Sequence, residues 1–414
     1  MHAYNMQPHF FLFITVEFIY TKQQKRMFSI YQIIIPALLA FIGTLWIHPK
    51  VLKIAIMKDL VDNPSARKLQ RNPVPNMGGS AVFFGIIIGL CSSQAMFSSP
   101  KAFMLVAAML IMLYIGIMDD ILSLTPRIRF AIEILIVCWL MFANNSSLNC
   151  FHGLWGLGCI PNYIAVPLTI ISCVGIINAI NLIDGVNGLS SGFCLMASVL
   201  FATMFYFLGN AVMMTISISA AGAVIPFFLH NVFGHKTRMF IGDSGTLVIG
   251  TMMSMCVISM LEITPASIVL AGKGVGFIPF EFAVLSIPVF DTLRVMSTRI
   301  LHGKSPFSPD KTHLHHMFID FGFSHIATTI SILSLNFIIV AAWFISYKLG
   351  ASIDAQLYIV MSLSIIFTFG LYKYLKIQLV KEGKTFKVLQ NIGKAINLEK
   401  KGIWEVIQKR IDKI

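Results

Sequence analysis

Residues 102–120 read AFMLVAAMLIMLYIGIMDD, a run of uncharged, mostly apolar residues that ends in Asp119 and Asp120. An α-helix needs about 20 apolar residues to cross the hydrocarbon core of a bilayer, so this run is close to the required length. The two aspartates end the run and do not interrupt it. The segment therefore predicts a transmembrane helix that carries two adjacent carboxylates to one face of the membrane.

The composition of the whole chain extends this interpretation. Of 414 residues, 57% are hydrophobic and 12% are charged, about half the charged fraction of a soluble globular protein. A disordered chain, a coiled coil and a secreted disulfide scaffold are thereby excluded. We expect an all-α, polytopic integral membrane protein with eleven transmembrane helices, near residues 28–48, 77–97, 101–118, 128–143, 162–180, 189–208, 211–231, 244–262, 276–297, 325–347 and 353–374.

The distribution of Lys and Arg predicts the orientation, because cytoplasmic loops are enriched in these residues. Thirteen lie in or at the borders of the loops after the first, third, seventh and ninth predicted spans, and three lie in or at the borders of the intervening loops. We therefore expect the N-terminus outside and the C-terminus in the cytoplasm. Residues 28–375 form the predicted transmembrane domain. Residues 376–414 form a basic amphipathic tail, and a helix of this kind favours the membrane interface.

Residues 1–27 do not fit this orientation, because their basic residues would lie outside. An over-long translation start is the favoured interpretation, and a signal-like segment without a small-residue cleavage site is the alternative. Cys150 and Cys159 bracket a short Gly-rich loop. They could pair if that loop is extracytoplasmic, and two free thiols are the alternative.

Several of the few acidic residues fall at span ends or in loops of the predicted cytoplasmic face. Asp119 and Asp120 are adjacent, and two neighbouring carboxylates favour a cation that relieves their repulsion. In NLIDGVNG (181–188), polar residues recur every three positions, and in FIGDSGT (240–246) an aspartate opens a predicted span. No cysteine accompanies these carboxylates, so the expected metal is a hard cation held by oxygen, Mg²⁺ or alternatively Mn²⁺.

The loop at 298–324 gathers histidines and cations within RILHGKSPFSPDKTHLHHMFIDFG (299–322). Arginine binds phosphate through two parallel hydrogen bonds, so this loop predicts contacts with phosphate groups. Zinc is the alternative ligand for the histidines, but no cysteine lies nearby. Acidic turns, a hard cation and a basic histidine-rich loop on one face indicate phosphate chemistry on a molecule that resides in the membrane.

Five motifs in this order resemble the polyprenyl-phosphate N-acetylhexosamine-1-phosphate transferases of glycosyltransferase family 4. The resemblance covers about residues 28–375 and rests on PVPNMGGSAVF (73–83), the pair Asp119-Asp120, NLIDGVNG, FIGDSGT and SPFSPDKTHLHH (305–316). Members of this family initiate lipid-linked cell-surface glycans such as O-antigen, enterobacterial common antigen and teichoic acid. The histidine motif is similar to that of the branch that uses UDP-N-acetylhexosamine, and the phospho-MurNAc-pentapeptide branch is the alternative within the family.

The resemblance implies that polyprenyl phosphate, expected to be undecaprenyl phosphate, attacks the β-phosphorus of a UDP-sugar, expected to be UDP-GlcNAc. Polyprenyl-diphospho-sugar would form and UMP would leave, with Mg²⁺ on the diphosphate, at the cytoplasmic face of the bacterial inner membrane. The implied catalytic residues are Asp119, Asp120, Asp184, His313, His315 and His316. The implied metal ligands are Asp243 and Asp184, and the implied substrate-binding residues are Asn181, Asn187, Arg299, Lys311 and Arg127.

Asn187 departs from the family, because many members carry Asp at that position, and its role as a metal ligand is therefore in doubt. A secondary transporter is the rival function. It would place acids near the bilayer midplane and show inverted repeats, whereas this chain places them at the rim of one face. No nucleic acid is expected as a partner. The sugar, the downstream glycan, the choice between direct displacement and a covalent intermediate, and the oligomeric state, a homodimer included, stay open.

Overall fold

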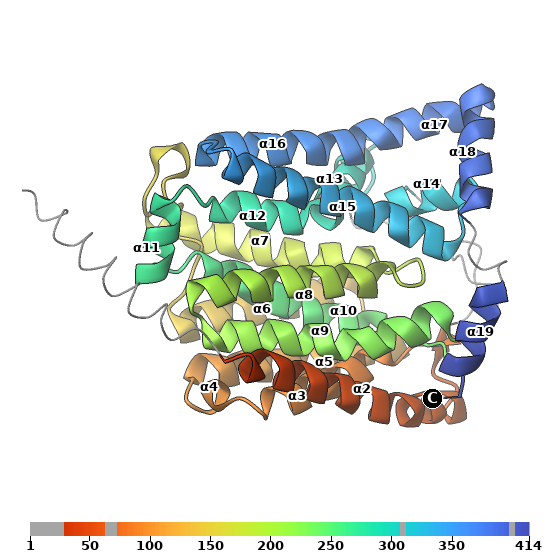
Figure 1. Ribbon diagram of the computed structural model, residues 1–414, viewed down its shortest axis with the longest axis horizontal. Coiled ribbons are helices and arrows are strands. Elements are labelled where there is room, and N and C mark those ends of the chain that lie inside the picture. Colours follow the sequence, from red (N-terminus) through yellow and green to blue (C-terminus); the bar gives the residue numbers. More distant parts are fainter. Residues whose placement is uncertain (1–28, 63–72, 307–311, 397–401, 414) are drawn as a thin grey trace, which may run out of the picture.

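The computed structural model describes residues 29–62, 73–306, 312–396 and 402–413. The prediction for residues 1–27 lies outside them. Long helices run side by side through the molecule (Figure 1). In the first half of the chain they are α2 (Tyr31–Met57), α3 (Gly78–Leu90), α4 (Gln94–Phe97), α5 (Pro100–Leu122), α6 (Pro126–Asn144), α7 (Asn162–Leu182), α8 (Leu189–Leu208) and α9 (Ala211–Phe233), with the short strands β1 (Val61–Asp62) and β2 (Val74–Pro75) pairing antiparallel.

The second half of the chain continues the same architecture and ends in two short tail helices. Its helices are α10 (Gly242–Met260), α11 (Pro265–Gly272), α12 (Phe277–Val284), α13 (Ser286–Leu301), α14 (Leu314–Asp320), α15 (His325–Lys348), α16 (Ile353–Ile365), α17 (Leu371–Lys381), α18 (Lys384–Ala395) and α19 (Gly402–Ile411). A 3₁₀ turn, η1, covers Leu154–Gly156, and a π-helical turn, η2, covers Ile366–Gly370 between α16 and α17.

Each of the eleven predicted spans coincides with a helix or with consecutive helices, which confirms the all-α, multi-pass membrane architecture. Within the described ranges, eight helices are long and apolar enough to cross a bilayer, or nine if α11 and α12, bent by 91°, count as one span. The predicted spans at 77–97, 128–143 and 276–297 are not among the eight. The number eleven and the orientation remain predictions.

Each of these three spans differs from a continuous apolar helix for a visible reason. The helix α3 has 13 residues, which is shorter than a single crossing requires. The helix α6 carries Arg127, Arg129 and Glu133 in its first turns. The predicted span at 276–297 is divided between α12 and α13 at Leu285, and Pro288 lies in the first turn of α13, where its missing N–H needs no partner.

The helix α10 is the central helix of the structure. It packs against α3, α5 and α7, and all its residues from Ser244 to Met260 are buried. The peripheral helices α2, α5 and α15 instead expose large apolar side chains, among them Leu38, Phe103 and Phe337. Such an exposed apolar surface is costly in water and is expected where helices face lipid.

The amino end of α10 is fixed by a close backbone crossing with α3. A Cβ atom added at Gly79 would overlap the backbone nitrogen and Cα of Gly245. The two helices can therefore approach to this separation only because residue 79 is glycine. This contact agrees with a structural role for the glycines of the 73–83 motif.

The loops predicted to be cytoplasmic meet at one end of the molecule. In Figure 1, α14, α18 and α19 lie at one end, and α4 and α11 lie at the opposite end. The loop between α6 and α7 belongs to the opposite end. There Cys150 and Cys159 face each other in an antiparallel bridge, and both are free thiols in this structure.

The tail segment folds into the amphipathic helices α18 and α19, and part of their apolar surface lies against the protein. Trp404 of α19 is buried, and its ring centroid lies 4.8 Å from that of Phe233 at the end of α9. Phe386 of α18 packs beside Phe321, with 5.3 Å between ring centroids. Val406 remains exposed. The tail helices therefore contact the ends of the bundle helices, and their contact with the membrane interface remains a prediction.

Replacing Gly79 by alanine should destabilise the fold, because the added methyl group has no room between α3 and α10. Overpacking of this kind costs about 1–3 kcal/mol. Gly175→Ala is the matched control, because nothing lies within 4 Å of its added Cβ. Thermal unfolding in detergent, followed by size-exclusion chromatography, should give a lower midpoint for Gly79→Ala than for Gly175→Ala. Equal midpoints would contradict the close crossing.

Candidate active site

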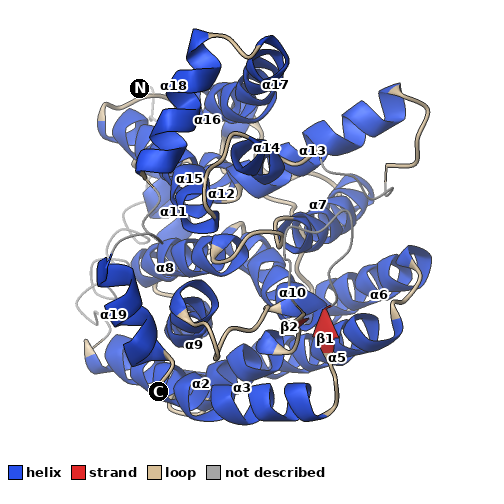
Figure 2. Cartoon of the chain, turned by 90° about the vertical axis from the view of Figure 1, so that its right-hand side faces the viewer, coloured by secondary structure: helices blue, strands red, loops and turns tan. Residues whose placement is uncertain are grey.

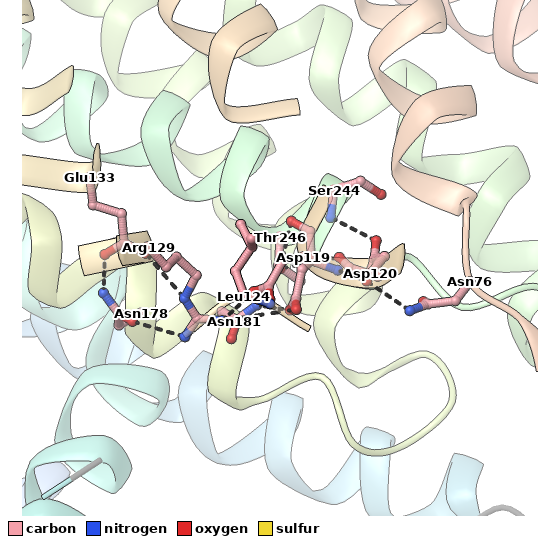
Figure 3. Close-up of polar contacts among 12 residues, drawn as sticks. Asn76, Asp119, Asp120, Leu124, Arg129, Glu133, Asn178, Asn181, Ser244 and Thr246 are labelled. Atoms are coloured by element: carbon pink, nitrogen blue, oxygen red, sulfur yellow. Dashed lines mark hydrogen bonds and ion pairs between the residues drawn. The ribbon is translucent and has the colours of Figure 1, made fainter. Parts of the chain in front are cut away.

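Asp120 joins three separate segments at the end of the bundle. Its carboxylate accepts hydrogen bonds from the backbone N–H groups of Asp243 (3.0 Å) and Ser244 (3.1 Å), which open α10. It also accepts one from the amide of Asn76, 2.8 Å away, in the loop before α3 (Figure 3). The first N–H groups of a helix lack intrahelical partners and favour an anion. The predicted site residue Asp120 therefore serves as the cap that holds α10.

Asp120 contacts the backbone of α10, whereas Asp119 pairs with the guanidinium of Arg129. Its carboxylate accepts a hydrogen bond from the backbone of Leu124 (2.8 Å) and forms an ion pair with Nη1 of Arg129 (3.0 Å). The same Nη1 lies 3.9 Å from the carboxylate of Asp243. Arg129 thus lies between two of the predicted site carboxylates and offsets part of their charge (Figure 3).

The sequence interpretation did not single out Arg129. Its guanidinium also lies 3.5 Å from the carboxylate of Glu133, one turn further along α6, and 3.5 Å from Oδ1 of Asn178 on α7. The predicted residue Arg127 is exposed in the first turn of α6. A signal was present, because Arg129 and Glu133 have i,i+4 spacing inside a predicted span, where charged residues are functional by default.

The motifs NLIDGVNG and FIGDSGT, which were expected at the same face of the membrane, lie in direct contact. The side-chain amide of Asn181 donates to the carboxylate of Asp243 and to the hydroxyl of Thr246, 2.8 Å away. Asp184, in the loop between α7 and α8, accepts a hydrogen bond of 2.6 Å from Ser190. Burial, and secondarily the nearby charge of Asp243, raise the pKa of Asp184 to about 6.

Asn187 shares that loop but reaches another helix. Its backbone N–H donates to Nδ1 of His325 (3.3 Å), and its backbone carbonyl accepts from the hydroxyl of Thr329 (2.9 Å). Both partners belong to α15. These contacts fix the loop position, and they leave the function of the Asn187 side chain a prediction.

The donor chemistry of this cluster suits a hard divalent cation. Asp119, Asp184 and Asp243 offer carboxylate oxygens, which Mg²⁺ prefers. Across the described ranges, no group of three His, Cys, Asp or Glu side chains already converges as a ligand set. The carboxylates are instead bonded to Arg129, Asn181 and Ser190. The residues fit Mg²⁺ in type, and binding would require some of these contacts to rearrange.

The histidine motif is anchored by a residue outside the predicted catalytic set, Asp291 of α13. Its carboxylate lies 2.9 Å from Nδ1 of His313 and accepts from the backbone N–H of Leu314 (3.2 Å). Nη2 of Arg294 forms an ion pair of 2.7 Å with the same carboxylate. Asp291 therefore fixes both the first histidine and the start of α14.

His315 connects the histidine motif to NLIDGVNG. A Cβ atom added at Gly185 would lie 2.6 Å from Nε2 of His315, so the imidazole occupies the space that any side chain at 185 would need. The ring of His315 stacks on that of His313, with 5.6 Å between centroids, and lies 4.4 Å from that of His316 at an interplanar angle of 41°. Burial, followed by these two neighbours, lowers the pKa of His315 well below its usual value, so the ring is neutral at pH 7.

The remaining predicted cations are placed differently. Arg299 is buried at the end of α13 and donates from Nη1 to the carbonyl of Pro306 (2.6 Å), which holds the start of the histidine loop. Lys311 lies outside the described residues.

A large apolar cavity begins beside Arg129, the ion-pair partner of Asp119. Its volume is about 680 Å³, and Arg129, Asn178 and Arg299 are among its lining residues at this end. Along α7 the lining extends from Leu182 to Leu168, roughly 21 Å of helix at 1.5 Å per residue. Phe151 and Trp155 line it at the far end. No local sequence pattern indicated this cavity, because its walls come from helices distant in the chain.

Comparison with known proteins places these features in a family. The model of glycosyl transferase family 4 matches residues 102–261. A probable undecaprenyl-phosphate N-acetylglucosaminyl 1-phosphate transferase of Bacillus subtilis is 30% identical over 315 residues, which cover 74% of this chain and 83% of that protein. A decaprenyl-phosphate N-acetylglucosaminephosphotransferase of Mycolicibacterium smegmatis is 31% identical, covering 70% and 75% of the two chains.

An undecaprenyl-phosphate alpha-N-acetylglucosaminyl 1-phosphate transferase of Salmonella typhi is 30% identical over 281 residues, covering 66% of this chain and 72% of that protein. The similarity to these relatives extends well beyond the segment matched by the family model and includes most of the described bundle. The resemblance inferred from the five motifs is confirmed, and the chain belongs to glycosyl transferase family 4.

Proposed function

We propose that this protein transfers a sugar 1-phosphate, GlcNAc 1-phosphate in the simplest case, from a UDP-sugar to undecaprenyl phosphate and releases UMP. The observation that carries the proposal is that Arg129, the ion-pair partner of Asp119 in the carboxylate cluster, lines one end of a long apolar cavity. A substrate that carries a phosphate on a hydrocarbon chain fits this site, with the phosphate at Arg129 and the chain in the apolar cavity. The printed names of the relatives, which act on polyprenyl phosphates, favour the same substrate class.

The lipid substrate would lie in the cavity with its phosphate toward Arg129. An isoprenoid chain is apolar and extended, and the cavity offers apolar walls along α7 over roughly 21 Å. Arg129 and Arg299 line the end nearest the acids, and a guanidinium binds phosphate oxygens in pairs. The rest of a long polyprenyl chain would extend into the bilayer.

In the proposed reaction an oxygen of the lipid phosphate attacks the β-phosphorus of the UDP-sugar. A new phosphorus–oxygen bond forms, the bond from the β-phosphorus to the bridging oxygen breaks, and UMP leaves with the electron pair. Asp119 orients the lipid phosphate and accepts its proton when the phosphate is monoanionic, and Arg129 offsets the charge that accumulates between the phosphates. Mg²⁺, held by Asp243 and Asp184, would supply further charge neutralisation for the diphosphate.

The histidine motif would bind the nucleotide part of the donor. His315 is neutral at pH 7 because burial lowers its pKa, so it offers a hydrogen bond without a full charge. Asp291 keeps His313 in place through its contact with Nδ1, which directs the other ring nitrogen away from α13. UDP-sugars are cytoplasmic metabolites of bacteria, so we assign this end of the bundle to the cytoplasmic face of the inner membrane.

An isotope-tracing assay tests the reaction directly. Purified protein in detergent, given undecaprenyl phosphate and UDP-GlcNAc labelled on the β-phosphorus, should move the label into a chloroform-extractable product and release UMP in equal amount. Transfer of the sugar alone would leave the label on UDP and contradict the proposal. A secondary transporter would release no UMP. Substituting UDP-GalNAc for UDP-GlcNAc in the same assay identifies the preferred sugar.

Replacing Arg129 and Arg127 in turn should show which arginine acts at the site. The structure indicates Arg129, whereas the sequence interpretation named Arg127. Arg129→Gln removes the cation between Asp119 and Asp243, and loss of a group that stabilises developing charge typically costs about 10²-fold in turnover. Arg127→Gln removes the same charge from an exposed position two residues away and should cost less than about threefold. Equal losses in initial rates of folded protein would contradict the assigned role of Arg129.

Activity should require a divalent cation and depend on Asp243. Washing with EDTA should abolish transfer, and added Mg²⁺ should restore it. Asp243→Asn should raise the Mg²⁺ concentration for half-maximal activity by about tenfold or more, because one anionic oxygen is lost. Asp354→Asn, at the opposite end where Asp354 accepts from the backbone of Trp155, is the control. Unchanged activity after exhaustive chelation would rule out the metal.

A further inference from the structure

The C-terminal tail ends on the loop that leads into α10. One carboxylate oxygen of Asp412, Oδ1, accepts hydrogen bonds from the backbone N–H groups of His235 (2.9 Å), Lys236 (3.1 Å) and Thr237 (3.3 Å). It also accepts from the hydroxyl of Thr237, 3.1 Å away. Successive N–H groups that converge on one point form an anion-binding concavity, and the carboxylate of the tail fills it.

The apolar side of α19 positions this carboxylate. Trp404 is buried against Val232 and Ile326 and contacts the ring of Phe233. Figure 2 shows α19 beside α9 at this end of the bundle. The helix is therefore held by a hydrophobic contact on α9 and by hydrogen bonds on the residues that follow α9. Two independent contacts of this kind are unusual for a solvated basic tail.

The loop that Asp412 holds, residues 234–241, continues into the candidate active site. The carbonyl of Thr237 lies 2.9 Å from Nε2 of His48, and its hydroxyl lies 3.0 Å from Nδ1 of His230. Five residues after Thr237 the chain reaches Gly242 and then Asp243, whose backbone Asp120 holds. Thr237 is thus fixed from the bundle side by two histidines and from the outside by Asp412.

We infer that Asp412 is a positioning residue of the transferase: it fixes the loop 234–241 from outside the bundle and thereby sets the position of Asp243. Asp412 lies far in sequence from the predicted site residues. Among the described residues it accepts hydrogen bonds from His235, Lys236 and Thr237, so it acts through the loop. The tail is then a part of the active-site scaffold, and its basic composition does not define its function. The kinetic consequence rests on the proposed function, whereas the structural consequence does not.

Hydrogen–deuterium exchange tests the structural consequence without any assay of activity. Asp412→Ala removes the shared acceptor, so amides in a peptide covering 234–241 should exchange at least about tenfold faster, since their protection requires a bonded partner. Glu405→Ala is the matched control, because it removes the same charge from an exposed position on α19. Exchange in Asp412→Ala equal to that in Glu405→Ala would overturn the inference whatever the enzyme's activity.

Kinetics test the consequence for Asp243. Asp412→Ala should lower turnover by about tenfold, because small displacements of groups that position reacting atoms cost up to about 10² in rate. It should also raise the Mg²⁺ concentration for half-maximal activity. Asp412→Asn keeps an oxygen acceptor and should recover most of the turnover. A loss explained entirely by less folded protein, with unchanged Mg²⁺ dependence, would overturn the inference, and so would equal losses in the alanine and asparagine variants.

Discussion

The hydrogen bonds from the backbone of α10 to the carboxylate of Asp120 are the contact on which the site depends. The central helix begins at the membrane rim with unpaired N–H groups, and Asp120 satisfies two of them from α5 while also binding Asn76. A buried, unbonded pair of N–H groups would cost about 1–3 kcal/mol each. Because the cap is a side chain of another helix, α5 and α10 cannot shift relative to each other without breaking it, and Asp119 and Asp243 stay at a defined separation.

The sequence predicted much of this arrangement for physical reasons that can be identified. Long apolar runs give helix positions directly, so every predicted span coincides with helical structure. Motifs such as NLIDGVNG and FIGDSGT were expected on one face, and Asn181 joins them. The divided span at 276–297 was predicted as one helix, because hydropathy does not register a break between two apolar segments.

What the sequence did not reveal depends on contacts between distant segments. The sequence interpretation gave Asp119 the main role and Asp120 a supporting one, and only the fold shows that Asp120 caps α10 while Asp119 pairs with Arg129. The cavity along α7 is lined by helices that precede and follow α7 in the chain. No local sequence pattern could therefore indicate it. The tail reads as a basic amphipathic segment, and the position of Trp404 against Phe233 depends on the shape of α9.

The position of Arg129 between Asp119 and Asp243 also affects the stability of the site when no substrate is bound. Two carboxylates of the cluster have a cation attached to the chain itself, so their charge is partly compensated when no ion and no substrate are bound. A newly inserted chain can therefore complete the bundle with no ligand bound at this cluster. On the metal requirement proposed above, scarcity of the ion would lower the rate of transfer without reducing the amount of folded protein.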